Sequence, residues 1–141
     1  MRLQALRPAE WGRLPRFLLA GGVATLLHWV TMLVFIRAGL DAVLATGIGA
    51  TVGLLANYFA QHRYAFSSGL PHGIAFPRYL TGAALGWALN LAGFSLLLAA
   101  GAGVAPSQMI TTGLVAFANY LFAQRFVFHE EPTIHTQYPD A

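Results

Sequence analysis

The residues best suited to chemistry in this 141-residue chain recur in two copies 62 residues apart. They are Asn57 with Arg63, Asn119 with Arg125, and Arg16 with Arg78. Guanidinium groups bind phosphate through charge-assisted hydrogen bonds, and amides bind hydroxyl groups. Together these types suit a phosphate joined to a sugar. The alternative is that the four arginines only fix membrane topology and that the amides only join helices.

Small and polar residues also recur at steps of four, which places them on one helix face. The sets are Ala20, Ala24 and His28; Gly49, Gly53 and Asn57; Gly82, Gly86 and Asn90; and Thr111, Val115 and Asn119. Close helix packing is the preferred interpretation for the glycines, whereas an amide facing lipid is costly, so the asparagines are expected to line a cavity. His28 and Asn90 lie about 16 Å into their spans, near mid-depth.

No catalytic or cofactor chemistry is predicted. The chain has no Cys, no phosphate-cradling glycine loop and no nucleophile with a base beside it. No Asp or Glu falls within a predicted span, which argues against a proton-coupled small multidrug exporter. His28 has no second ligand at helical spacing, so no metal site is expected. A packing or substrate contact is favoured for His28, and proton coupling stays open.

The composition indicates an integral membrane protein. Hydrophobic residues make up 57% and charged residues 9%, with no Lys, whereas soluble domains carry about 25% charged residues. Four stretches approach the roughly 20 residues that cross a bilayer as a helix. They are residues 17–36, 43–60, 79–99 and 106–123. The expected fold class is all-α, a polytopic membrane protein with four transmembrane helices.

The arginines predict the orientation. Seven of the eight lie on one side of the predicted spans, and only Arg37, beside Asp41, lies on the other. The positive-inside rule then places both termini in the cytosol. The net charge of +3 concerns orientation and anionic lipid, so no nucleic acid partner is expected. The aromatic residues expected at the interfaces are Trp11, Tyr64, Tyr79 and Phe126.

The repeat predicts the domain organisation. Each copy contains two spans, so both copies enter from the same side and form two parallel helical hairpins. The repeats occupy 16–66 and 78–128 within a transmembrane domain at 16–128. Residues 1–15 are expected to form a cytosolic N-terminal segment. The polar residues 129–141, with two Pro, are expected to form a disordered cytosolic tail.

Two motifs mark the repeat: the opening Arg16-Phe17-x3-Gly21-Gly22, and the pattern Asn-Tyr-x4-Arg-x2-Phe that closes the second and fourth spans. Together they resemble the GtrA-like family. The resemblance covers residues 16–128. It implies translocation of a polyprenyl-phosphate-linked monosaccharide, such as undecaprenyl-phosphate glucose, from the inner to the outer leaflet for cell-surface polysaccharide synthesis or glycosylation. It also implies a bacterial inner membrane and a membrane glycosyltransferase as a partner.

The family's motif positions fall on Asn57, Tyr58, Arg63, Asn119, Tyr120 and Arg125. On this hypothesis the lipid phosphate is bound by Arg63 and Arg125, with Arg16 and Arg78. The sugar enters a cavity lined by Asn57, Asn119, Asn90, His28, Tyr58 and Tyr120, while the prenyl chain stays in membrane lipid. Four short helices barely enclose a sugar phosphate, so a homodimer is expected. The rival hypothesis is a non-transporting membrane anchor or accessory subunit of a polyprenyl-phosphate glycosyltransferase.

Overall fold

A computed structural model describes residues 12–130, and no strand occurs among them. The elements are α2 (Arg13–Arg37), α3 (Ala42–Ala60), η1 (Gln61–Ala65), α4 (His72–Ala99), α5 (Val104–Phe122) and η2 (Ala123–Val127). The all-α class predicted from the sequence is confirmed. Trp11, most of the segment 1–15 and the tail beyond Glu130 lie outside the described residues.

The turns inside the two hairpins are built alike. Gly39 ends α2 with φ 90°, and Gly101 ends α4 with φ 86°. Glycine adopts this left-handed conformation without a steric penalty, which is why it commonly follows a helix. Asp41 then starts α3, because its side chain accepts hydrogen bonds from Val43 N (2.9 Å) and Leu44 N (3.2 Å).

Helix α4 begins at His72, well before the predicted span 79–99. Pro71 precedes it in an extended conformation, and Pro77 lies inside the helix near its beginning. A proline there removes one backbone hydrogen bond, and the helix tolerates it best close to its start. Hydropathy placed the boundary too late because His72, Pro77 and Arg78 interrupt the apolar run.

Both hairpins finish in a π-helical turn. Phe66 N bonds to Gln61 O in η1, and Phe128 N bonds to Ala123 O in η2, each at 2.9 Å. Such turns are rare and often occur at functional sites. The two turns have the same offset as the sequence repeat, so the duplicated motif forms the same unusual backbone twice.

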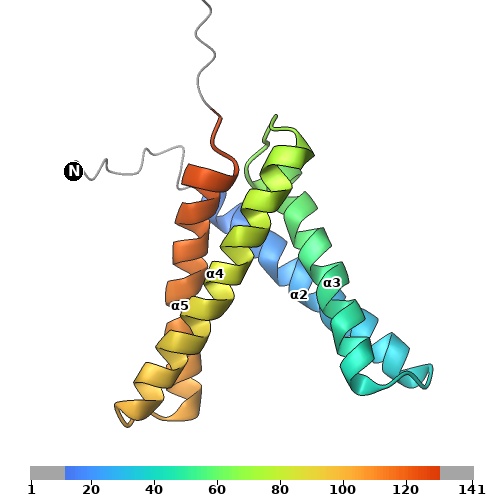
Figure 1. Cartoon of the computed structure of the whole chain (residues 1–141), viewed down its shortest axis with the longest axis vertical. Helices are drawn as coiled ribbons and strands as arrows, with labels where there is room; N and C mark the ends of the chain where they lie inside the picture. Colours follow the sequence, from blue (N-terminus) through green and yellow to red (C-terminus); the bar gives the residue numbers. More distant parts are fainter. Residues whose placement is uncertain (1–11, 131–141) are drawn as a thin grey trace, which may run out of the picture.

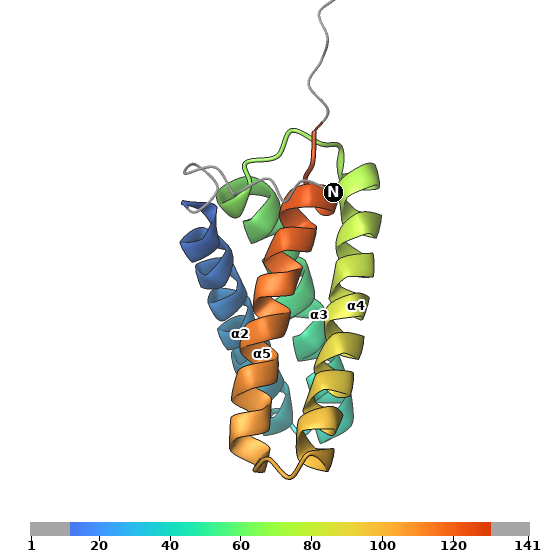
Figure 2. The ribbon, with the colours of Figure 1, turned by 90° about the vertical axis from the view of Figure 1, so that its left-hand side faces the viewer.

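The chain forms two hairpins that meet at one end and diverge at the other (Figures 1 and 2). Helix α2 packs on α3, and α4 packs on α5, whereas contacts between the hairpins are few. They meet where η1 and η2 lie, and the loops after α2 and α4 are far apart in Figure 1. The fold is therefore a pair of parallel hairpins that is open toward its loop end.

Aromatic side chains join the hairpins at their meeting point. Phe17 of α2 packs edge-on against Tyr120 of α5 with ring centroids 5.5 Å apart, and against Phe66 at 6.2 Å. Phe66 stacks on Phe128 at 4.9 Å. Each aromatic pair contributes about 0.5–1.5 kcal/mol beyond burial. The hairpins are thus joined at the end that carries the repeated motif.

The lengths of the helices suit a multi-pass membrane protein. Among the described residues, α2, α3 extended by η1, and α4 are long and apolar enough to cross a membrane. Helix α5 falls outside that group but runs alongside α4 for most of its length (Figure 2). An antiparallel partner of a spanning helix must cross with it, so four crossings remain the simplest arrangement.

Candidate functional site

A cavity of about 260 Å³ lies where the two hairpins meet. All four long helices contribute to its walls. Its polar lining consists of Asn57, Gln61, Tyr79 and Asn119. The sequence predicted Asn57 and Asn119 here and missed Gln61. Gln61 lies four residues after Asn57, so extending the four-residue step by one position would have found it.

Both polar atoms of the Asn57 side chain form hydrogen bonds within the protein. Its Oδ1 accepts from Gln61 Nε2 at 3.0 Å, and its Nδ2 donates to the Tyr79 hydroxyl at 3.0 Å. Tyr79 in turn donates to Leu54 O at 3.2 Å. Tyr79, predicted to lie at the membrane interface, has a side chain that is only 7% exposed and lines the cavity, so it faces the interior of the protein. This chain of bonds ties α3 to α4.

Asn119 differs from its repeat partner. Its amide lies against Gly86, where an added Cβ would clash with it. Within residues 12–130 its side chain makes no hydrogen bond, although it lines the cavity. The repeat explains the difference, since the positions equivalent to Tyr79 and Gln61 are Phe17 and Ala123. Asn119 therefore presents a free amide to the cavity.

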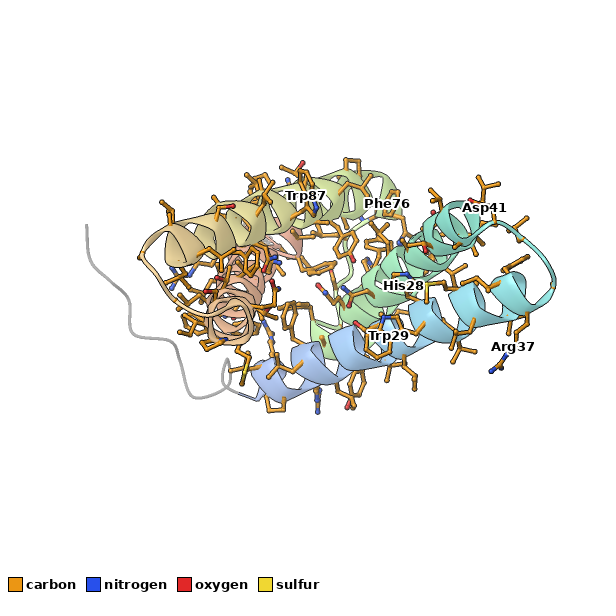
Figure 3. All side chains as sticks on the ribbon, turned by 90° about the horizontal axis from the view of Figure 1, so that it is seen from below. His28, Trp29, Arg37, Asp41, Phe76 and Trp87 are labelled. Atoms are coloured by element: carbon orange, nitrogen blue, oxygen red, sulfur yellow. The ribbon has the colours of Figure 1, made fainter. Side chains whose placement is uncertain are left out.

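A second cavity, of about 220 Å³, continues from the first, since Asn57 and Tyr79 line both. It reaches Thr25 and His28 on α2, toward mid-depth. His28 lies between α2 and α3 (Figure 3), packed so closely that a Cβ at Gly49 would approach its carbonyl oxygen to 2.6 Å. Among the described atoms His28 Nε2 is buried without a hydrogen-bond partner.

The structure does not bring every predicted site residue into the cavity. Asn90 lies on α4, where its Oδ1 accepts from Gln108 Nε2 at 3.5 Å, and it lines neither cavity. Equal depth therefore does not place Asn90 beside His28, which packs within the other hairpin. Tyr58 and Tyr120 are 1% and 0% exposed and belong to the aromatic core.

The four predicted arginines lie at the end where the hairpins meet. The Arg16 guanidinium lies 5.6 Å from the centroid of the Tyr64 ring, and its repeat equivalent, Arg78, lies 5.4 Å from that of Phe126. Arg63 and Arg125 are exposed. In the described part of the chain, none of the four forms an ion pair with a carboxylate. Their charges are therefore available to an anionic ligand.

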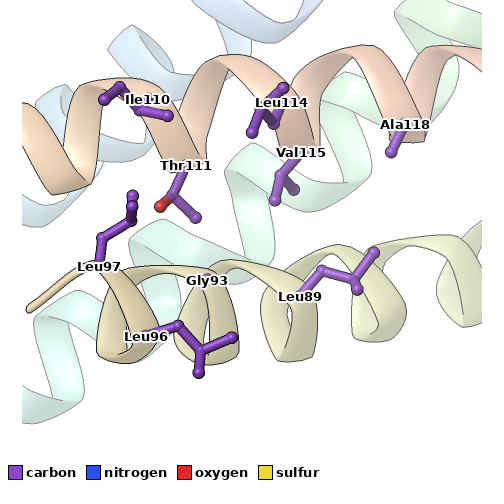
Figure 4. A pocket seen from close by; sticks show the side chains of 9 residues that line it. All are labelled: Leu89, Gly93, Leu96, Leu97, Ile110, Thr111, Leu114, Val115 and Ala118. Carbon is purple, nitrogen blue, oxygen red and sulfur yellow. The ribbon is translucent and has the colours of Figure 1, made fainter. Parts of the chain in front are cut away.

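An apolar pocket of about 420 Å³ lies between α4 and α5 (Figure 4). Leu89, Leu96 and Leu114 are among its lining residues. They lie on a different face from Ala83 and Asn119, which line the polar cavity. Such a surface suits hydrocarbon chains of the bilayer.

Within the described residues, no cluster of three His, Asp or Glu side chains that could hold a metal ion occurs.

The comparisons with known proteins give one result. A family model described as GtrA/DPMS, transmembrane domain, matches residues 16–128. Neither the curated proteins nor the solved structures yield a match. The matched range includes both hairpins and both copies of the repeated motif, and it coincides with the range over which the motifs resemble the GtrA-like family.

Proposed function

This chain belongs to the GtrA/DPMS transmembrane-domain family, and on that premise we propose that it moves a polyprenyl-phosphate-linked monosaccharide from the cytosolic to the outer leaflet of a bacterial inner membrane. The family points to the handling of polyprenyl-phosphate sugars by generally non-catalytic membrane proteins. The observation that carries the proposal is a polar cavity walled by all four helices, at the same end as four arginines that form no ion pair within residues 12–130.

The arginines bind the lipid phosphate in this proposal. Arg63 and Arg125 are exposed and free to form bidentate hydrogen bonds with phosphate oxygens. Arg16 and Arg78 lie against the rings of Tyr64 and Phe126, and Arg78 Nη1 also donates to Phe126 O at 3.2 Å, so both guanidinium groups are held in position at this end of the hairpins. Because each repeat supplies one free and one ring-supported arginine, the phosphate meets positive charge from both hairpins.

The sugar leaves the bilayer surface by entering the cavity. Asn119 offers an unused donor and acceptor to a hydroxyl group, and the second cavity continues the polar wall to Thr25 and His28. Asn57 acts differently, because its amide holds α3 to α4. The prenyl chain remains outside, against the lipid-facing surfaces of the helices. Movement of the lipid-linked sugar between the leaflets is facilitated diffusion, and consumption of the sugar on the outer side drives it in one direction.

The remaining features of the proposal are a homodimer, both termini in the cytosol, and a membrane glycosyltransferase that supplies the lipid-linked sugar. The positive-inside pattern supports the orientation. A polyprenyl-phosphate sugar needs a synthesising enzyme on the side where nucleotide sugars occur.

Reconstitution into liposomes tests this function. Undecaprenyl-phosphate glucose is placed in both leaflets, and its accessibility to an impermeant oxidant is followed with time. The wild type should expose the inner-leaflet pool, and Arg63→Ala combined with Arg125→Ala should reduce the rate about tenfold or more, since each charged hydrogen bond contributes about 1.5–3 kcal/mol. Arg37→Ala, at the opposite end, is the matched control. If the wild-type protein exchanges the lipid no faster than empty liposomes do, the transport function is wrong and the membrane-anchor function remains.

A further inference from the structure

Three polar side chains on the second hairpin play no part in the proposed cytosolic site. Gln108 Nε2 donates to Thr112 Oγ1 at 2.9 Å on α5 and approaches Asn90 Oδ1 of α4 at 3.5 Å. Gln108 lies four residues from the loop end of α5, about 6 Å along the helix, and Asn90 lies about 13 Å from the loop end of α4. The cluster therefore belongs to the half of the hairpin opposite the arginines.

The repeat fixes the direction that this cluster faces. Asn90 corresponds to His28, and Thr112 corresponds to Ala50. His28 and Ala50 both line the cavity on the first hairpin. Since the hairpins are parallel repeats that face each other, Asn90 and Thr112 lie on the equivalent inward wall of the second hairpin. At this depth the hairpins have diverged (Figure 1), and Gln108 and Thr112 are exposed.

The hydrogen-bonding capacity of the cluster is only partly used. Gln108 and Thr112 are exposed, unlike a polar contact that merely joins two helices. No bond within the described residues uses Gln108 Oε1 or Asn90 Nδ2. Exposed amides in hydrocarbon are expensive and commonly mark a substrate path. One acceptor and two donors remain close together, which is the pattern that neighbouring sugar hydroxyls require.

We propose that Asn90, Gln108 and Thr112 form a second sugar site, in the outer half of the path, through which the sugar passes before release. This rests on the proposed function and deepens it. The cluster contains no ionisable side chain, and between Asp41 and Glu130 the sequence has no carboxylate. The second site therefore selects a neutral hydroxyl-rich monosaccharide over an amino sugar or a uronic acid.

Trp87 gives a local probe of this site. It precedes Asn90 by one helical turn and is 72% exposed. In nanodiscs of a Trp11→Phe, Trp29→Phe background, undecaprenyl-phosphate glucose should change Trp87 fluorescence, whereas undecaprenyl phosphate without sugar should not. Gln108→Leu with Thr112→Val should weaken the fluorescence titration and slow leaflet exchange about fivefold to tenfold, given about 0.6 kcal/mol for each hydrogen bond in a membrane.

Thr51→Val is the matched control, because the Thr51 hydroxyl bonds to Gly47 O of its own helix outside both cavities. The single variant Gln108→Met, which keeps the side-chain length, replaces the double variant if that one does not fold. Exchange and fluorescence equal to the control would overturn the second site and leave the proposed function standing. No exchange by the wild type would overturn the proposed function, and an unchanged Trp87 signal would then overturn the site as well. One further outcome would refute the proposal. If the double variant loses a dimer that cross-linking detects in the wild type, while its Trp87 titration with undecaprenyl-phosphate glucose is unchanged, the cluster belongs to an interface between subunits.

Discussion

Substitutions of the two repeated asparagines should show their effects in different assays, because within residues 12–130 only Asn57 has hydrogen-bond partners for its side chain. Asn57→Ala removes the acceptor of Gln61 and the donor to Tyr79. Hydrogen bonds between membrane helices average about 0.6 kcal/mol, with a maximum near about 1.7. The free energy of unfolding should therefore fall by about 1 kcal/mol, and by at most about 3.

Asn119→Ala removes no hydrogen bond within the described residues and should destabilise the protein less than Asn57→Ala. It removes the free amide of the cavity, so leaflet exchange should slow about threefold to tenfold, which corresponds to one lost hydrogen bond of about 0.5–1.5 kcal/mol. Unfolding in mixed micelles gives the stability, and exchange per folded protein in liposomes gives the rate. Asn57→Ala should keep most of its exchange once corrected for the folded fraction.

Two further variants test whether Asn57 and Asn119 have different roles. Asn57→Ala and Tyr79→Phe should be non-additive in stability, because they remove the same bond. Ala123→Gln should give Asn119 the partner that Gln61 gives Asn57, which raises stability and lowers exchange. Equal losses of stability and of exchange in the two alanine variants would show that the asparagines act alike, and the division of roles would be wrong.

Two other predictions concern packing and orientation. Gly49→Ala should destabilise the protein by about 1–3 kcal/mol in the same unfolding assay, because the new Cβ would lie 2.6 Å from the backbone oxygen of His28. Gly22→Ala is the control and should be neutral, because its new Cβ would meet no atom within 4 Å. Equal effects of the two substitutions on stability would contradict the close packing of α2 against α3 at Gly49. Because the chain has no Cys, single substitutions Ser68→Cys and Leu40→Cys can report sidedness with an impermeant maleimide on intact cells. Only Leu40→Cys should be labelled, and the reverse would invert the proposed topology.

The sequence was sufficient to predict two parallel hairpins, since the repeat encodes turn and motif twice. Gly39 and Gly101 end their helices alike, and Gln61 and Ala123 open the same π-helical turn. The π turns themselves were not predicted, because no residue type or spacing in the motif was recognised as distinguishing a π turn from a continued α-helix; the phenylalanines that follow the turns, Phe66 and Phe128, are buried.

The site was predictable only in part, because depth and spacing do not determine which way a side chain points. Asn57 and Asn119 line the cavity as predicted from their helix face. Tyr58 and Tyr120 follow them by one residue, about 100° around the helix, and so enter the aromatic core. His28 and Asn90 lie at a similar depth but on different hairpins, which diverge toward their loop ends (Figure 1), and His28 packs against Gly49 and Gly53 of its own hairpin.

The central claim is that the sugar passes between the two hairpins, and adjacent glycines allow a direct test. Gly21 lines the second cavity and Gly22 does not, and at neither would an added Cβ meet another atom within 4 Å. The measurement is the rate of undecaprenyl-phosphate glucose exchange in liposomes for Gly21→Phe and Gly22→Phe at equal folded protein. The phenyl ring at position 21 should fill the path and abolish exchange, while the ring at position 22 should leave the rate near that of the wild type. Unimpaired exchange in Gly21→Phe would contradict a route between the hairpins.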